Sequence, residues 1–234
     1  MRIAVTRPQH DAERTAAALR ARGHEVLIAP LLKIESVDAA LRSSWGGVII
    51  TSANAAHALA AHTARSALTK LKLFAVGERS AEAARQVGFK DVTSAGGDVR
   101  DLVRVLTECK ADTTAPLLYL AGEDRARDLI GELAARGIAA EIAVIYRAAT
   151  LPFPPELATA LKDGTVDAVL HYSRRSAESY IAGAKQAGVI KPALAVRHIC
   201  LSVQVAEPLK GAGAVDVMIA ARPDEAALLQ RVGA

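Results

Sequence analysis

Residues 3–23, IAVTRPQHDAERTAAALRARG, pass from a short apolar run through a polar loop to an alanine-rich segment that ends in glycine. This order predicts a strand, a loop and a helix over residues 11–22, with the glycine as its stop. The same order returns at residues 117–137, LLYLAGEDRARDLIGELAARG. The final glycine lies 17 positions after Thr6 in the first stretch and 17 after Leu120 in the second. The matching spacing indicates an internal repeat.

Other parts of the two halves correspond in the same way. Residues 49–52 correspond to 169–173, residues 74–76 correspond to 199–201, and Gly88 corresponds to Gly213. Any α/β protein alternates strands and helices, but three matching spacings favour a duplication. Alternating elements predict mostly parallel sheets with helices on both faces. We therefore predict an α/β protein of two similar, flavodoxin-like lobes.

The expected strands are short apolar runs: 3–5, 26–34 (interrupted by Pro30), 47–50, 73–76, 92–94, 117–120, 140–146, 168–170, 199–201 and 215–219. The expected helices are 11–22, one starting near Ser52, 80–87, 98–106 capped by Asp98, 125–136, one after Ser173, one ending at Lys210, and one starting at Pro223.

The composition is that of a globular protein. Of the 234 residues, 51% are hydrophobic and 23% charged, which excludes wholesale disorder. The net charge is +4, and only 3% of residues are aromatic. Nucleic-acid binding needs basic patches and stacking rings, so a nucleic-acid partner is not expected. With 20 Arg and 9 Lys, the chain suits a small acidic ligand better.

Two cysteines, Cys109 and Cys200, are too few for a disulfide framework and suit a reducing compartment. The longest stretch without a charged side chain, residues 43–64, holds many hydroxyl, amide and histidine groups. A membrane helix would not carry them, so we expect a strand and a helix there, and no membrane partner. The expected location is the cytoplasm.

Hydroxyl side chains gather where the predicted strands end, at Thr6, Thr51–Ser52, Ser80 and Tyr172–Ser173. In doubly wound sheets, ligands bind at the carboxyl ends of the strands, where helix N-termini offer free N–H groups. For any one of these residues, helix capping alone is an alternative role. Their place on one edge of a sheet favours a binding site for carboxylates.

Standard catalytic and metal-binding motifs are absent from the sequence. His57 and His62 are five positions apart, which does not place them on one helix face as a metal pair. Asp124 and Asp128 are flanked by arginines, so an ion-paired helix start is favoured over a metal site.

An ordered series of short motifs resembles the uroporphyrinogen-III synthase family over nearly the whole chain. The motifs are Val5-Thr6-Arg7-Pro8, Ala29-Pro30-Leu31-Leu32-Lys33-Ile34, Ile49-Ile50-Thr51-Ser52-Ala53-Asn54-Ala55, Ala75-Val76-Gly77-Glu78-Arg79-Ser80-Ala81, Leu120-Ala121-Gly122-Glu123-Asp124-Arg125, Val144-Ile145-Tyr146-Arg147 and Ser173.

The resemblance implies two lobes joined by a two-stranded linker, with a ligand cleft between them. Lobe 1 would combine residues 1–35 and 150–234, and lobe 2 would be the inserted residues 36–149. The linker strands would lie near 31–37 and 146–155, where Pro152, Pro154 and Pro155 cluster. A sequential boundary at Lys110–Pro116 is the alternative that the repeat alone permits.

The resemblance also implies an activity. The family cyclises hydroxymethylbilane, a linear tetrapyrrole with eight carboxylates, to uroporphyrinogen III with inversion of the last pyrrole ring and loss of water. It needs no metal and no organic cofactor, and we expect a monomer in tetrapyrrole and heme biosynthesis. Positioning and electrostatics suffice for such chemistry, because the electron-rich pyrrole assists departure of the hydroxyl.

By resemblance, the family's hydroxyl positions fall on Thr51, Ser52, Ser80 and Ser173, and its tyrosine near the linker falls on Tyr146. Tyr146 would assist departure of the hydroxyl as a general acid, or alternatively pack the junction of the lobes. The candidate carboxylate partners are four arginines, each of which could instead be a solvated surface charge: Arg7, Arg125, Arg147 and Arg174.

One segment departs from the family pattern. A hydroxyl expected at position 205 is replaced by Val205, and Ser202 or Gln204 would have to substitute for it. This departure keeps open a second hypothesis, a non-enzymatic two-lobed sensor or adaptor that binds a small acidic ligand.

Overall fold

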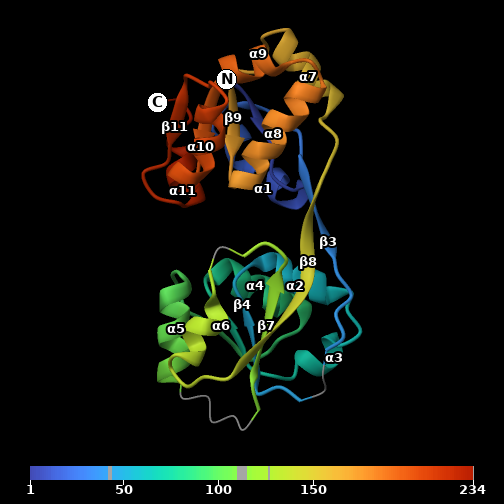
Figure 1. The fold of residues 1–234 in the computed structure, drawn as a ribbon, viewed down its shortest axis with the longest axis vertical. Coiled ribbons are helices and arrows are strands. Elements are labelled where there is room, and N and C mark those ends of the chain that lie inside the picture. The colour runs from blue at the N-terminus through green and yellow to red at the C-terminus, as the bar shows by residue number, and fades with distance from the viewer. Residues whose placement is uncertain (42–43, 110–114, 126, 234) are drawn as a thin grey trace. The chain divides into compact units, whose positions relative to one another are not determined.

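The protein is described by a computed structural model that covers residues 1–41, 44–109, 115–125 and 127–233. The chain divides into two compact units (Figure 1). Unit 1 combines Met1–Lys33 with Ala149–Ala234, and unit 2 is the intervening segment Ile34–Ala148. Both ends of the chain therefore belong to unit 1. Residues 110–114 of the alternative boundary lie outside the described residues.

Unit 1 contains a five-stranded sheet in the order β11-β10-β9-β1-β2, and all four pairings are parallel. Its strands are β1 (Arg2–Val5), β2 (Glu25–Ile28), β9 (Ala168–His171), β10 (Arg197–Cys200) and β11 (Val217–Ile219). Its helices are α1 (Gln9–Arg20), α7 (Pro155–Lys162), α8 (Arg174–Gln186), α9 (Ile190–Ala195), α10 (Val203–Gly211) and α11 (Glu225–Leu229).

Unit 2 contains a six-stranded sheet in the order β3-β8-β7-β4-β5-β6, in which β4 to β8 pair in parallel. Its strands are β3 (Leu32–Ser36), β4 (Gly47–Ile50), β5 (Leu73–Ala75), β6 (Val92–Ser94), β7 (Leu117–Gly122) and β8 (Ala140–Thr150). Its helices are α2 (Ala53–Ala60), α3 (Arg65–Leu68), α4 (Glu78–Val87), α5 (Val99–Glu108) and α6 (Leu129–Ala134).

Each sheet has a hydrophobic core on both faces, as its apolar strands require. In β4, for example, Val48 and Ile50 face one core and Ile49 faces the other. In unit 1, α1 and α11 pack on one face, and α7 to α10 on the opposite face. In unit 2, α5 and α6 cover one face, and α2, α3 and α4 the other. The predicted layers of parallel sheet between helices are confirmed.

The two sheets have the same strand order once β7 and β8 are matched to β1 and β2, and β4, β5 and β6 to β9, β10 and β11. This is the flavodoxin-like order, read in unit 2 from a different starting strand. One offset of 114 residues relates Thr6 to Leu120 and Gly23 to Gly137. Both glycines have left-handed backbone angles, with φ of 81° and 74°, which explains why this residue type ends both segments. The topology supports the duplication inferred from the spacing.

The strands β3 and β8 pair with each other where the chain crosses between the units (Figure 1). The amide of Val37 donates to the Ile145 carbonyl at 2.8 Å, and that of Leu151 to the Leu31 carbonyl at 2.9 Å. The numbering rises along one strand as it falls along the other, so the pair is antiparallel. The 114-residue offset also relates Val37 to Leu151 and Leu31 to Ile145, so the repeat makes these two hydrogen bonds equivalent.

Three local predictions are wrong. The helix predicted over 125–136 is α6, which begins only at Leu129 because the Asp128 side chain caps it by accepting from the Gly131 amide at 3.0 Å. The last helix begins at Glu225 rather than Pro223, since Asp224 is its N-cap. The single strand predicted over 26–34 is two strands in different sheets, β2 (Glu25–Ile28) and β3 (Leu32–Ser36).

Candidate functional site

In unit 2, two hydroxyl residues follow the carboxyl end of β4. Ser52 is the N-cap of α2, and its Oγ accepts a hydrogen bond from the Asn54 amide at 3.2 Å. The hydroxyl of Thr51 shares a hydrogen bond of 2.9 Å with the hydroxyl of Tyr119, which lies on the neighbouring strand β7. Capping is therefore one role of Ser52, while Thr51 is tied to the sheet and makes no cap.

Tyr146 on β8 lies at the same edge. Burial raises the pKa of its phenol above the usual value of 10, the charges of Tyr119 and Asp124 raise it further, and a hydrogen bond with the Ser52 side chain lowers it in part. The phenol is therefore protonated at neutral pH and available as a proton donor. Prediction from sequence named Tyr146 and Ser52 separately, and the structure brings them into contact.

The position of the Tyr146 ring depends on Gly122, at the end of β7. A Cβ atom at Gly122 would lie 2.6 Å from Cζ of Tyr146, closer than any real contact. The absence of a side chain therefore creates the space that the ring occupies. The backbone holds the tyrosine from the same place, since the Glu123 amide donates to the Tyr146 carbonyl at 3.0 Å.

The remaining residues predicted in unit 2 are Ser80, Arg125 and Arg147. Ser80 lies in the first turn of α4 and is buried, with 6% of its surface exposed. The Arg125 guanidinium donates to the carbonyls of Gly122 and Glu123, at 3.2 Å each. Arg147 is half-exposed and forms an ion pair of 3.1 Å with Glu35.

A pocket of about 580 Å³ opens beside β7 and the loop that follows it. Tyr119 and Arg125 line it, together with Glu123, Arg127 and the apolar side chain of Ile142. Arg127 forms an ion pair with Glu132 at 2.7 Å. Of the two arginines that line this pocket, Arg125 is the one that bonds to carbonyl oxygens and not to a carboxylate.

In unit 1, Ser173 follows β9 and caps α8. Its Oγ accepts from the Ser176 amide at 3.1 Å, and its own amide donates to the Ser176 Oγ at 3.2 Å, which forms a reciprocal capping box. The next residue, Arg174, is half-exposed and pairs with Glu178 at 2.9 Å and Glu207 at 2.8 Å. Ser173 thus occupies the same place in unit 1 as Ser52 does in unit 2.

Arg7 does not lie open to solvent as a carboxylate clamp would. Only 8% of the residue is exposed, and its guanidinium pairs with Glu225 at 2.9 Å and Asp11 at 3.2 Å. Its Cζ lies 4.0 Å from the centre of the Tyr172 ring. The charge of Arg7 is therefore already matched inside unit 1.

The departure at Val205 has a structural counterpart. Val205 and Ser80 each lie three residues after the N-cap of their helix, α10 and α4, and both are buried. Val205 packs in the apolar core of unit 1. Ser202, the N-cap of α10, makes no capping bond with its side chain, and its hydroxyl instead donates to Gln204 at 3.2 Å.

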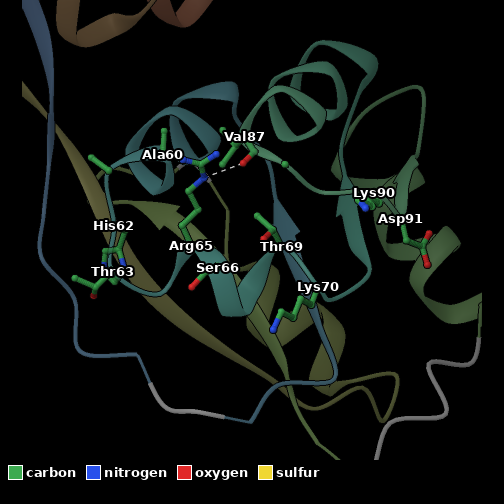
Figure 2. A pocket seen from close by; sticks show the side chains of 12 residues that line it. Ala60, His62, Thr63, Arg65, Ser66, Thr69, Lys70, Val87, Lys90 and Asp91 are labelled. Atoms are coloured by element: carbon green, nitrogen blue, oxygen red, sulfur yellow. Dashed lines mark hydrogen bonds between the residues drawn. The ribbon is translucent and has the colours of Figure 1, made fainter.

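Figure 2 shows a different pocket, of about 790 Å³, between α3 and the ends of α2 and α4. It lies near the amino ends of the strands, because it meets the helices at their C-termini. Its basic side chains suit those negative helix ends, and Arg65 donates to the Val87 carbonyl of α4 at 2.9 Å. Helix capping thus accounts for Arg65, and the place of the pocket near the amino ends of the strands separates it from the predicted site.

Two residues of the site in unit 2 escaped prediction from sequence. Tyr119 is the one aromatic residue of β7, whose other side chains are aliphatic or absent. Because a buried phenol needs a hydrogen-bond partner, a tyrosine in this strand indicated a polar neighbour. Gly122 ends the same strand, where glycine often marks a close approach by another group. Nothing in the sequence indicated that the approaching group is Tyr146.

Two negative findings apply to the described residues. No three or more His, Cys, Asp or Glu side chains in this part of the chain are grouped so that they could hold a metal ion. Within the same residues, none of the helices combines the length and the apolar character needed to cross a bilayer.

Comparison with known families identifies one match over most of the chain. The sequence model of the uroporphyrinogen-III synthase HemD family matches residues 13–230. Among curated proteins, none matches the sequence significantly.

Solved structures with a similar fold carry the same family name. The uroporphyrinogen-III synthetase of Helicobacter pylori is 19% identical, with a TM-score of 0.71 over 99% of this chain and 98% of that one. A mutant uroporphyrinogen III synthase of the extremely thermophilic bacterium Thermus thermophilus is also 19% identical, with a TM-score of 0.50 over 98% of this chain and 96% of that one. At these identities the likeness shows a shared fold, and the family model carries the assignment.

Proposed function

The chain belongs to the uroporphyrinogen-III synthase family of cofactor-independent cyclising lyases, and from this premise we propose that Tyr146 activates the substrate in it. The family reaction closes hydroxymethylbilane to uroporphyrinogen III, inverts the last pyrrole ring and releases water. The observation that carries the proposal is the phenol of Tyr146, which lies in contact with Ser52 at the edge of unit 2 where the strands end, and which burial keeps protonated at neutral pH.

In the proposed step, Tyr146 donates its proton to the hydroxymethyl oxygen as the carbon–oxygen bond breaks. The electron pair of that bond leaves with the oxygen, as water, and the pyrrole nitrogen supplies electrons to the carbon. The phenol is a modest acid, but it needs to supply little because the pyrrole already assists the departure. The phenolate regains a proton when the ring closes and the pyrrole carbon loses one.

Substrate carboxylates are proposed to bind at the helix starts of each unit. Ser52 and Ser80 in unit 2, and Ser173 in unit 1, lie where helix N-termini present N–H groups and a partial positive charge. Thr51 contributes less directly, since its hydroxyl is bonded to Tyr119.

Among the four candidate arginines, Arg125 is the best supported carboxylate partner. Its bonds in the described part of the chain go to carbonyl oxygens, which leave its positive charge unmatched. Arg147 and Arg174 are half-exposed and would have to exchange a protein carboxylate for one of the substrate. Arg7 is proposed to stabilise unit 1 instead, because it is buried between two carboxylates.

We also propose that the chain acts as a monomer in the cytoplasm. Both cysteines are free, Cys109 at the surface and Cys200 in the interior, as suits a reducing compartment. Analytical ultracentrifugation at micromolar concentration tests the first part, since a dimer would sediment at twice the mass.

The rival function is a non-enzymatic sensor of a small acidic ligand, favoured by Val205 in place of a hydroxyl. One assay separates the two. Purified protein is supplied with hydroxymethylbilane, and the uroporphyrinogen I and III isomers are separated. The synthase gives mainly the type III isomer. Product that is only the spontaneous type I isomer would exclude the enzyme.

A further inference from the structure

A single carboxylate near the C-terminus of the chain joins three elements of unit 1. Glu225 opens α11, and its Oε1 accepts hydrogen bonds from Arg7 at 2.9 Å, from the hydroxyl of Tyr172 at 3.3 Å, and from the Thr15 hydroxyl. Its Oε2 accepts from Arg14 at 2.8 Å. The donors come from the loop after β1, from α1 and from the loop after β9.

We propose that Glu225 is a positioning residue for substrate binding at the carboxyl-end edge of unit 1. It acts through Tyr172, which directly precedes Ser173, the N-cap of α8. Fixing the tyrosine fixes the loop from which Ser173 and the first amides of α8 meet a carboxylate. The inference rests on the proposed function, in which Ser173 binds substrate.

The environment of Tyr172 supports this role. Its ring is clamped on one side by the Arg7 guanidinium at 4.0 Å, and its hydroxyl lies 3.4 Å from that of Thr15 as well as 3.3 Å from Glu225. Burial raises the pKa of Tyr172 to about 12, and the charge of Glu225 adds to this effect. The phenol therefore remains a donor to Glu225 over the working pH range.

The positions of Tyr172 and Glu225 are fixed because two of their shared partners, Thr15 and Arg7, are buried and themselves held. Thr15 is fully buried, and Arg7 has a second carboxylate, Asp11, at 3.2 Å. At the end of β1, the hydroxyl of Thr6 donates to the Leu170 carbonyl of β9 at 3.0 Å, which ties the two strand ends together. A displacement of the Glu225 side chain should therefore displace the loop between β9 and α8.

Two variants test the proposal in the full-length protein. Tyr172→Phe removes one hydroxyl and keeps the ring under Arg7. We expect the KM for hydroxymethylbilane to rise about 3- to 10-fold, the equivalent of one hydrogen bond, with kcat unchanged. Glu225→Gln keeps the shape but sets an amide against Arg7 and Arg14, so the KM is expected to rise at least as much.

Each variant has a matched control. Tyr180→Phe also removes a buried hydroxyl from unit 1, one that donates to the Ala193 carbonyl at 3.0 Å, away from the loops. Asp216→Asn breaks the ion pair with Arg197, of 3.0 Å, near the amino ends of the strands. These controls are expected to lower the melting temperature comparably and to leave the KM unchanged.

A second readout does not depend on the reaction. Hydrogen exchange at the amides of residues 173–176 should accelerate in Tyr172→Phe and Glu225→Gln, and not in the controls. An unchanged KM together with unchanged exchange in both variants would overturn the inference, as would equal KM changes in the controls. If the wild-type protein makes no type III isomer, the proposed function fails, and the exchange data alone decide whether Glu225 positions the loop.

Discussion

The carboxyl-end edges of the two units differ in their chemistry although their sheets have the same strand order. In unit 1, Arg7 and Tyr172 follow the central strands β1 and β9, and they form an ionic network with Glu225 of α11. In unit 2 the corresponding edge carries neutral hydroxyl pairs, Thr51 with Tyr119 and Ser52 with Tyr146. The repeat therefore preserved the scaffold while the edge residues diverged.

The matched positions show how the divergence arose. Tyr172 and Thr51 each stand directly before the N-cap serine of the next helix. Arg7 corresponds to Ala121 under the 114-residue offset. Unit 1 thus uses its charged groups to hold its own loops. In unit 2, Arg125 is bonded only to carbonyl oxygens among the described residues, and the phenol of Tyr146 lies next to the hydroxyl of Ser52. This contrast favours unit 2 for the chemical step.

The largest effect is expected from Gly122→Ala. The new Cβ would lie 2.6 Å from the Tyr146 ring and force it aside, and a displacement of about 1 Å in a reacting group costs roughly 100-fold in rate. Steady-state kinetics with hydroxymethylbilane measures this loss in kcat.

Unit 1 offers a matched control for this glycine. A Cβ at Gly183 would lie 2.5 Å from Cδ2 of Phe153, so Gly183→Ala forces a similar clash with an aromatic ring away from the edge. We expect it to lower the melting temperature with kcat retained. If Gly122→Ala and Gly183→Ala lose kcat equally, the loss reflects general destabilisation, and the proposed role of unit 2 in the chemical step is contradicted.

The next largest effect is expected from Tyr146→Phe, which removes the proposed proton donor and keeps the shape of the ring. General acid assistance to an easy departure is worth about 10- to 100-fold, and the loss should appear in kcat and kcat/KM alike. If Tyr146 only packs its surroundings, the Phe variant keeps nearly full rate while Tyr146→Ala loses stability. Melting curves recorded beside the kinetics separate the two roles.

Acid is expected to weaken unit 1 selectively. His171 and His198 are both fully buried there, with 3.1 Å between Nε2 of His171 and Nδ1 of His198. Burial lowers the pKa of His198 to about 4, although Asp216 opposes the shift, and burial with the charge of His198 lowers that of His171 well below 6.5. Both rings are therefore neutral in the folded state at pH 5, where the unfolded chain binds protons.

Because the unfolded state then binds more protons, stability falls as the pH drops below 6.5, by about 2 kcal/mol at pH 5 for His198 alone. Hydrogen-exchange protection, corrected for intrinsic rates, should fall together in residues 1–33 and 149–234. Residues 34–148 should keep theirs, which also tests the proposal that the discontinuous lobe is one cooperative unit. Protection lost by 1–33 separately from 149–234 would contradict it, and His198→Phe should flatten the pH dependence.

Much of the fold followed from the sequence because local signals suffice for it. Apolar runs marked the strands, and glycines such as Gly23 and Gly137 marked the register of the repeat, because a left-handed turn requires them. Helix starts were less predictable. Arg125 and Arg127 are good helix formers, but α6 begins only at Leu129, because the Asp128 side chain caps it.

The site was only partly predictable, for a physical reason. Ser52 and Ser173 could be named because each follows a predicted strand, and Tyr146 could be named because it lies in a motif that resembles the family. The partners of Tyr172 and Arg7 could not, because Glu225 lies more than 200 positions from Arg7 and only the tertiary fold brings them together. The role of Gly122 likewise depends on which ring approaches it.

The smallest effects are expected from the cap serines. Ser52→Ala and Ser173→Ala should each raise the KM about 3- to 5-fold, because neighbouring helix amides still bind the carboxylates. Both also lose a capping bond, which costs about 1 kcal/mol of stability. Only Ser52 contacts Tyr146, so kcat should fall in Ser52→Ala alone. A decrease in kcat in Ser173→Ala would place unit 1 in the chemical step and break the contrast.

Ser202→Ala completes the series. Its side chain makes no capping bond, so removing it should leave the melting temperature unchanged, unlike the other two serines. Its hydroxyl donates to Gln204 at the start of α10, next to the buried Val205. If Ser202 supplies the hydroxyl that is absent at Val205, the KM rises about 2- to 3-fold, in keeping with one exposed hydrogen bond. An unchanged KM would show that Ser202 does not bind substrate, so that Ser173 would be the serine of this pair that does.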